Sequence, residues 1–275
     1  LEENPAYDVL RYPAIKADGT ALWGNRWSLD KLEERKMEIG SMKFTREYLC
    51  VPISTNTMLF DPEHIKACQN KYASLHSSAR EGYRYYIGYD PAISANGDYT
   101  VMMVIEVDDD MNKQVVHMLR AKGLDFREHI THIMNLCKRF QPEIVMIETN
   151  TFAKAFAMEL KNFPVREFTM SRKKKEEIIL NLQMNIDNHK LVLPMKDETS
   201  RAVTAQIVQE LGAFGINANG KIEGVGAHDD IVIALALANY ATKQFSDTFL
   251  DIDGSSLFNP EGSTQITGGG IFGIN

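Results

Sequence analysis

The order of extended and helical segments after residue 82 limits the folds open to this chain more than any other feature. Runs rich in β-branched and aromatic residues at 83–90, 99–107 and 114–119 follow one another closely, which is typical of adjacent strands. We therefore predict an antiparallel meander. Apolar strands at 143–148 and 165–169 then alternate with helical segments. This order predicts an α/β fold in which a mixed sheet, first antiparallel and then parallel, is flanked by helices.

Helical periodicity accounts for most of the remaining length. Apolar residues recur three and four positions apart, and capping or helix-breaking residues bound the segments. We expect helices at 126–140, 150–162, 171–189, 199–211 and 229–245, an extended segment at 191–193 and a hairpin at 216–222. Asn219-Gly220 is a strong turn signal for that hairpin. The whole arrangement is that of the ribonuclease-H-like fold.

Residue composition and periodicity divide the chain into three parts. Residues 1–80 are predicted to form a linker or lead-in segment with short helices, of which Ser28 and Ser41 are expected to cap the first two. We assign residues 81–246 to the ribonuclease-H-like domain. Residues 247–275 are rich in Gly, Ser, Thr and Asn and are predicted to form a flexible C-terminal tail.

Composition excludes several classes of function. The 30 basic and 37 acidic side chains give a formal net charge of −7, which argues against a protein that coats nucleic acid but leaves room for a local basic groove. No apolar run approaches the roughly 18 residues that a membrane span needs. The three cysteines are too widely spaced for a disulfide framework or a zinc site.

Two acidic residues end predicted strands. Asp90 ends the first strand, and Glu148 follows four apolar residues in a later one. Open α/β sheets bind ligands at the carboxyl ends of their strands, so both carboxylates would share a rim if these strands were parallel neighbours. Carboxylates that close repel each other, and both stay ionised only beside a cation. Their hard oxygen atoms favour Mg²⁺ or Mn²⁺.

A third source of acid opens the last predicted helix, in Gly226-Ala227-His228-Asp229-Asp230. The apolar residues that follow suit packing on a sheet, so Asp229 or Asp230 would project toward the same rim. An Asp at a helix start is usually a cap. Two strand-terminal acids together with an acidic pair at a helix start nevertheless indicate a metal site.

Four motifs occur in order along the chain: Gly88-Tyr89-Asp90-Pro91-Ala92, Gly97-Asp98-Tyr99-Thr100, Ile147-Glu148-Thr149-Asn150 and Gly226-Ala227-His228-Asp229-Asp230. In this order they resemble the nuclease domain of the large terminase subunit, the DNA-packaging motor of tailed bacteriophages. The segment from Trp27-Ser28-Leu29 to Met58-Leu59-Phe60 is similar to the link between the family's motor and its nuclease. The resemblance covers about residues 20–245.

The resemblance implies a ribonuclease-H-like endonuclease whose metal ligands are three acidic side chains. Carried over to this chain, they are Asp90, Glu148 and one of Asp229 and Asp230. Asp230 is the favoured member of the pair, although some relatives carry another Asp where this chain has Ile233. Two Mg²⁺ or Mn²⁺ ions held in this way would clamp a phosphodiester for in-line hydrolysis.

Two further residues near these motifs are candidate site residues. Asp98 lies in the Gly-Asp-Tyr motif and is implied to support the site. His228 borders the acidic pair and could relay protons or contact a phosphate. An ordinary turn residue and a capping or surface histidine are the simpler interpretations of the same two positions.

A basic run offers a way for an acidic chain to bind DNA. Residues 154–175 carry seven basic and two acidic side chains, a local charge of 7 − 2 = +5. Within it, Arg172, Lys173, Lys174 and Lys175 open a predicted helix, where positive charge opposes the macrodipole. An anionic partner explains their position better than helix stability does, and we predict that they bind DNA. A solvated charge run is the alternative.

The resemblance also implies a substrate and partners. The substrate would be double-stranded concatemeric viral DNA, cut when genome packaging begins and ends in the cytoplasm of the infected bacterial host. The partners would be the small terminase subunit and the portal of the procapsid. No Gly-x-x-x-x-Gly-Lys-Ser/Thr segment occurs, so an ATPase motor domain is expected upstream in the full-length chain. A junction resolvase or a transposase would share the same acids. A non-catalytic DNA-binding module is the third alternative, and it would be expected to have lost one of them.

Overall fold

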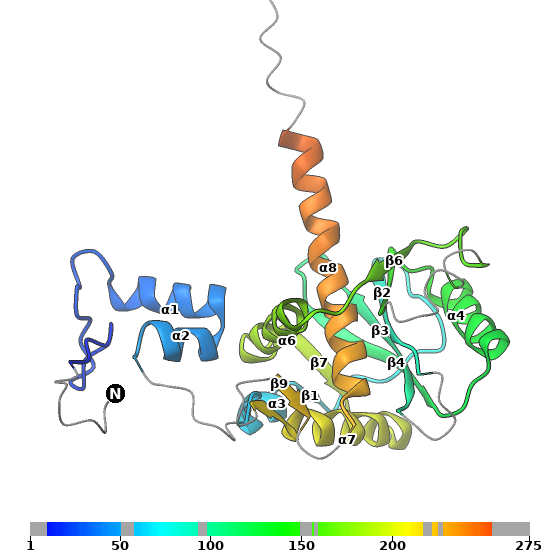
Figure 1. Cartoon of the computed structure of the whole chain (residues 1–275), viewed down its shortest axis with the longest axis horizontal. Coiled ribbons are helices and arrows are strands. Elements are labelled where there is room, and N and C mark those ends of the chain that lie inside the picture. The colour runs from blue at the N-terminus through cyan, green and yellow to red at the C-terminus, as the bar shows by residue number, and fades with distance from the viewer. Residues whose placement is uncertain are drawn as a thin grey trace, which may run out of the picture.

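A computed structural model describes residues 10–50, 58–92, 98–148, 156, 159–216, 222–224 and 228–254. A seven-stranded sheet in the order β1-β7-β4-β3-β2-β5-β6 forms the centre, and β8 and β9 form a separate hairpin (Figure 1). The strands are β1 (Gln69–Asn70), β2 (Arg84–Asp90), β3 (Thr100–Val107), β4 (Lys113–Ala121), β5 (Ile144–Glu148), β6 (Val165–Phe168), β7 (Leu191–Pro194), β8 (Phe214–Ile216) and β9 (Ile222–Gly224).

The predicted mixed sheet is confirmed by the pairing of its strands. β2, β3 and β4 form an antiparallel meander. β5 pairs with β2 in parallel, and β6 pairs with β5 in parallel. The ribonuclease-H-like α/β class expected from the order of elements is therefore the observed one.

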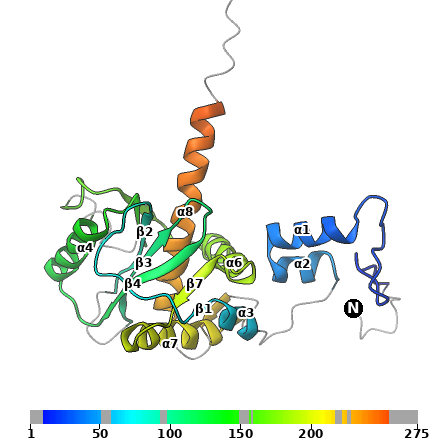
Figure 2. The same cartoon turned by 180° about the vertical axis from the view of Figure 1, so that it is seen from behind.

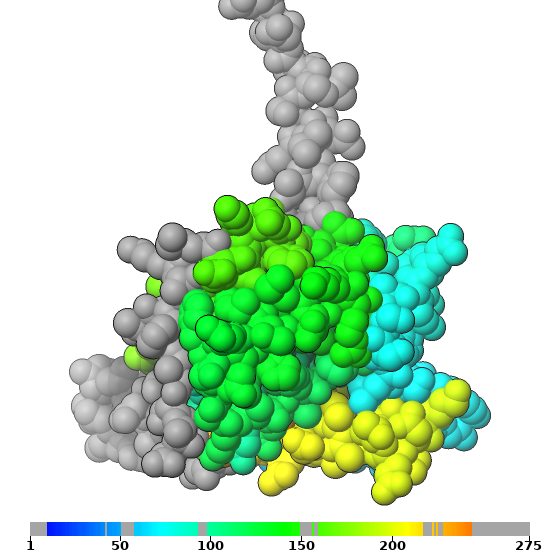
Figure 3. Space-filling model, turned by 90° about the vertical axis from the view of Figure 1, so that its right-hand side faces the viewer, coloured from blue at the N-terminus to red at the C-terminus, as the bar shows by residue number. Residues whose placement is uncertain are grey.

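Helices cover both faces of the sheet. They are α1 (Leu29–Ile39), α2 (Ser41–Glu47), α3 (Pro62–Ala67), α4 (Phe126–Phe140), α6 (Arg172–Asp187), α7 (Glu198–Gly212) and α8 (Asp230–Gly254). In Figure 1 α8 crosses in front of the sheet, and from behind, in Figure 2, the strands lie in front of it. Figure 3 shows the side of the molecule that carries α4, in green, with α7 below it in yellow.

Alternation along the strands divides the core into two layers. Successive strand residues point to opposite faces. Tyr85, Ile87 and Tyr89 therefore pack in the cluster that contains α4, as the sequence predicts for one side of this strand. Tyr86 lies in the other cluster, with α6, α7 and α8.

The first two helices show how the lead-in segment forms. The Ser28 side chain accepts a hydrogen bond from the N–H of Lys31 and caps α1, as expected. The cap predicted at Ser41 is wrong, because Gly40 occupies that position at φ 82°. The Ser41 hydroxyl instead donates to Asp187 at 2.6 Å, which ties α2 to the end of α6. Figures 1 and 2 show α1 and α2 standing beside the sheet layers.

Parts of the prediction fall outside the described structure. Most of the helix expected at 150–162 does, as does the Asn219-Gly220 turn, although β8 and β9 flank it as an antiparallel pair. Helix α8 continues to Gly254, beyond the expected end at 245, and residues 255–275 of the predicted tail are not described. The domain limits at 80 and 246 stay predictions. Within the described residues, no helix is long and apolar enough to cross a membrane.

One glycine sets how closely α8 lies on the sheet. A Cβ atom placed on Gly88 would lie 2.0 Å from the carbonyl oxygen of Ala234 and 2.4 Å from the backbone nitrogen of Ala238. Both atoms belong to the backbone of α8, which cannot move aside as a flexible side chain can. Gly88 is therefore needed for the helix to contact β2 directly.

We expect Gly88→Ala to lower the free energy of unfolding by about 3 kcal/mol or more, at the upper end of the cost of overpacking. Urea denaturation measures the change. Gly24→Ala is the control, because no atom lies within 4 Å of the added methyl group. An unchanged midpoint for Gly88→Ala would mean that α8 does not rest on β2 in this way.

Candidate active site

The sheet brings the two strand-terminal acids together. β2 and β5 are parallel neighbours, with Tyr89 paired to Ile147, so Asp90 and Glu148 follow side by side at the same rim. Even-numbered residues of both strands, such as Tyr86 and Met146, face the layer of α8. Asp90 and Glu148 share that parity and so project toward α8.

The two carboxyl groups are half-buried, and they lie close enough for a hydrogen bond between them to affect both pKa values. Burial raises the pKa of Asp90 well above its ordinary value, and the charges of Glu148, Asp230 and Asp229 raise it further. Burial also raises the pKa of Glu148, and Lys175 opposes that shift. Without a cation, these carboxyls therefore hold protons more tightly than carboxyls in water do.

The third acid comes from the first residue of α8. Asp230 is only 5% exposed, and its Oδ2 accepts a hydrogen bond from the N–H of Tyr99 at 2.9 Å. The Nδ1 atom of His228 lies 3.7 Å from Asp230 Oδ2 and 3.5 Å from Asp98 Oδ1. The motif at residues 97–100 is thus joined to the start of α8.

Two overlapping groups of side chains at this rim could hold metal ions. Asp98, His228 and Asp230 each offer a ligand atom, and these atoms lie within 4.8 Å of one another. Asp90 and Glu148 form the second group with Asp230, because the charges of Glu148 and Asp230 both raise the pKa of Asp90. Among the described residues, only the first group has three ligand atoms this close together. Carboxylate oxygens are the donors that hard divalent cations prefer, and their mutual repulsion is what such cations relieve. The donor set therefore fits Mg²⁺ or Mn²⁺.

Asp229 and Asp230 have different surroundings. Asp229 is partly exposed, and its Oδ2 lies 2.7 Å from the Nζ of Lys175. Its backbone oxygen accepts the first helical hydrogen bond of α8, from the N–H of Ile233, so Asp229 is the N-cap residue. Asp230 is the more deeply buried of the two, and its charge raises the pKa of Asp90.

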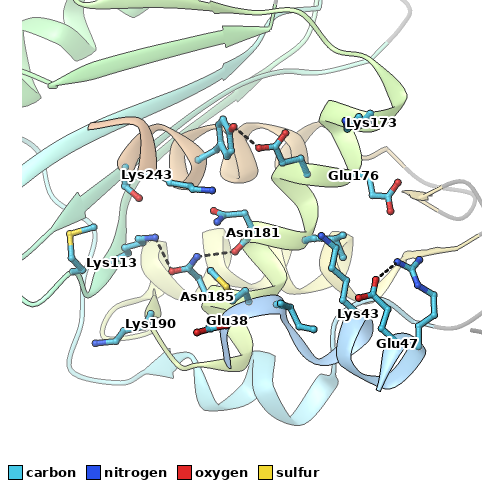
Figure 4. A pocket seen from close by; sticks show the side chains of 18 residues that line it. Glu38, Lys43, Glu47, Lys113, Lys173, Glu176, Asn181, Asn185, Lys190 and Lys243 are labelled. Carbon is cyan, nitrogen blue, oxygen red and sulfur yellow. Dashed lines mark hydrogen bonds and ion pairs between the residues drawn. The ribbon is translucent and has the colours of Figure 1, made fainter. Parts of the chain in front are cut away.

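The four basic residues at the start of α6 do not share one environment. Lys175 pairs with Asp229 in the site, and Lys174 lies 5.4 Å from the centroid of the Phe168 ring. Lys173 lines a cavity of about 880 Å³ between α1, α2, α6 and α8 (Figure 4). That cavity is lined by none of the candidate metal ligands.

Sequence reasoning missed the residues that support the acids. Glu210 on α7 accepts a hydrogen bond from the N–H of Ile231, and Arg120 on β4 lies 3.3 Å from the same carboxylate. The Tyr99 ring lies under two cations, Arg120 at 3.7 Å and Lys122 at 4.2 Å from its centroid. A buried acid in the last turn of a helix is a weak signal, and only the fold shows what it contacts.

Comparison with known proteins places this geometry in a family. Residues 87–241, more than half of the chain, match the family described as the terminase RNase H-like domain. The chain belongs to this family. Among curated protein sequences, none matches the chain.

Solved structures show the same fold. The large terminase nuclease from thermophilic phage G20c, crystallised with bound magnesium, is 22% identical, with a TM-score of 0.54 over 68% of this chain and 98% of that one. The nuclease domain from Thermus phage P74-26 is 21% identical over 64% of this chain and 92% of that one, with a TM-score of 0.50. The large terminase of bacteriophage HK97 is 12% identical, with a TM-score of 0.50 over 79% of this chain and 50% of that one.

The buried acids predict an unusual pH dependence of stability without metal. The folded protein keeps a proton on Asp90 that the unfolded chain has released, so stability should fall as pH rises above the ordinary Asp value of 3.8. Asp90→Asn removes this loss, and its advantage over the wild type should grow by about 1.4 kcal/mol per pH unit until the folded pKa is reached.

Urea denaturation in EDTA from pH 5 to 8 measures this difference. Adding Mg²⁺ should reverse the order, because binding to the folded state stabilises the wild type and not the variant. Equal dependence of stability on pH in the two proteins would show that Asp90 is not the group whose pKa is raised in the folded state.

Proposed function

We propose that this chain is a divalent-metal-dependent endonuclease that cuts double-stranded concatemeric viral DNA when genome packaging begins and ends. It would act as the C-terminal part of a terminase motor, in the cytoplasm of the infected bacterial host. The observation that carries the proposal is the convergence of Asp90, Glu148 and Asp230 at one rim of the sheet, where Asp230 is buried and the other two are half-buried. Family membership supports it, and so does the magnesium in the G20c terminase nuclease.

Asp90, Glu148 and Asp230 would hold two Mg²⁺ or Mn²⁺ ions, and Asp90, at the end of the central strand β2, would be a ligand. Bound divalent ions supply Lewis-acid activation of water and stabilise the charge on the leaving 3′ oxygen. Asp229 would contribute through Lys175 or by direct contact. Asp98 would hold His228 through its Nδ1 atom, which leaves the Nε2 atom to accept or deliver a proton.

Cations flank the acids at both ends of the rim. The carboxyl end of β4 carries Lys122, and the start of α6, after β6, carries Lys174 and Lys175. β4 and β6 are four strand positions apart, roughly 19 Å at about 4.8 Å per position. We infer that one strand of the duplex runs along this rim, with phosphates near both ends and the scissile bond at the acids.

Family membership supports the wider assignment. An ATPase motor domain upstream, the small terminase subunit and the portal of the procapsid would be the partners of the full-length protein. A junction resolvase or transposase would share the acids but would act on branched or transposon-end DNA. Cleavage of unbranched duplex DNA therefore favours the terminase assignment.

Substitution of the acids tests the metal site. We expect Asp230→Asn to reduce plasmid cleavage in Mg²⁺ by more than the 10–100-fold typical of residues that only support a ligand, and Asp90→Asn to do the same. Asp229→Asn should fall within that 10–100-fold range, and Mn²⁺ should restore part of its activity. Full activity in both Asp229→Asn and Asp230→Asn would exclude the start of α8 from the site.

The DNA path is tested by one lysine. Lys122→Ala should weaken binding of a duplex oligonucleotide and lower the salt slope by about 0.9, the loss of one phosphate contact. Fluorescence anisotropy in EDTA across a KCl series measures binding without cleavage. Lys138→Ala, an exposed lysine in the last turn of α4, is the matched control. An unchanged slope for Lys122→Ala would place the DNA elsewhere.

A further inference from the structure

Two acids stand in succession at the start of helix α8. A carboxylate there can cap the helix or contribute to the metal site, but it cannot do both. An Asp at an N-cap usually accepts hydrogen bonds from the second or third backbone N–H of its helix. Asp229 holds the N-cap position, but its side chain pairs with Lys175 at 2.7 Å. The orphan N–H groups at this helix start therefore need another acceptor.

Glu210 supplies that acceptor from a different helix. Its Oε2 accepts the N–H of Ile231 at 2.9 Å, and the N–H of Val232 also lowers its pKa. These are the second and third residues of α8, the donors that an N-cap side chain would otherwise satisfy. The other oxygen, Oε1, lies 3.3 Å from the guanidinium of Arg120.

Nothing on its own helix favours a carboxylate at this position. Glu210 lies in the last turn of α7, where the macrodipole disfavours negative charge. Its side chain is 7% exposed, and burial raises its pKa to about 7, with a further contribution from the charge of Asp230. The compensating contacts are all with Arg120 and the start of α8.

The contacts close a ring around Asp230. Asp230 accepts from the N–H of Tyr99, and the ring of Tyr99 lies against Arg120. Arg120 pairs with Glu210, and Glu210 binds the N–H of Ile231, the residue after Asp230. Asp230 is thus fixed through both its side chain and its backbone.

We propose that Glu210 is a positioning residue that caps α8 in place of Asp229, so that the Asp229 carboxylate can turn to Lys175 beside the metal site while Asp230 stays fixed at the rim. This inference rests on the proposed function for its consequence in catalysis. Its structural part, the transfer of the cap from Asp229 to Glu210, stands by itself.

A double-mutant cycle in metal-free buffer tests the transfer of the cap. In the wild-type background, Asp229→Ala removes no cap and should leave the unfolding equilibrium nearly unchanged. In a Glu210→Leu background, Asp229 can turn back to cap the helix, and Asp229→Ala should then cost roughly fivefold in the equilibrium constant, the usual loss for an N-cap Asp. Additive effects would overturn the proposal. Glu210→Ala, which also removes both acceptor oxygens, serves as the background if Glu210→Leu does not fold.

Metal affinity tests the consequence for the site. Glu210→Leu should weaken Mn²⁺ binding, measured by titration calorimetry without DNA, by about 10–100-fold, and Glu210→Gln should restore part of it. Thr204→Val is the control, because Thr204 is buried on the same helix and loses a hydrogen bond to the Pro194 carbonyl. Unchanged Mn²⁺ affinity in Glu210→Leu, or an equal loss in Thr204→Val, would overturn the positioning role. A wild type that binds Mn²⁺ but leaves DNA uncut would contradict only the proposed function.

Discussion

The direct contact between α8 and β2 at Gly88 sets the register on which the site depends. The missing side chain of Gly88 lies against Ala234 and Ala238 of the helix. Asp90 is two residues further along the strand, about 6.6 Å, and Asp230 is four residues back along the helix, about 6 Å. Because α8 begins at the rim where β2 ends, these two steps run in the same direction and bring the two carboxylates together. A shift of one residue in either element would separate them.

This register brings like charges together where Asp230 is buried and Asp90 and Glu148 are half-buried. The surrounding residues reduce the resulting loss of stability without removing it. The Tyr99 N–H stabilises the Asp230 carboxylate, and Lys175 lies beside Asp229 and lowers the pKa of Glu148. Burial still dominates, since the pKa values of Asp90, Glu148 and Asp230 are all raised. Repulsion among these carboxyl groups raises the free energy of the metal-free protein. A divalent cation that removes the repulsion would gain the same free energy when it binds.

The sequence predicts the sheet well because its strands carry strong local signals. β-branched runs mark the meander, and the strand-terminal acids Asp90 and Glu148 follow from the parity and direction of two strands. The sequence cannot show that Ser41 binds Asp187 rather than capping α2, because that bond spans 146 residues. It also cannot reveal Glu210 or Arg120 as neighbours of the acids, because their role exists only after α7, β4 and α8 have packed. Roles for Asp98, His228 and the basic run stay predictions.

The position of Lys175 changes how the basic run is understood. Read along the chain, Arg172 to Lys175 form one cluster opposite a helix dipole. In the fold, Lys175 is drawn to Asp229 inside the site, and Lys173 faces a cavity instead. Lys122 lies outside the basic run of the sequence. It is exposed, and it lies over the Tyr99 ring at the opposite end of the rim. Under the proposed function, an acidic chain would receive a polyanion locally, because its cations lie on either side of the carboxylates. A phosphate chain that spans these cations would pass over the acids.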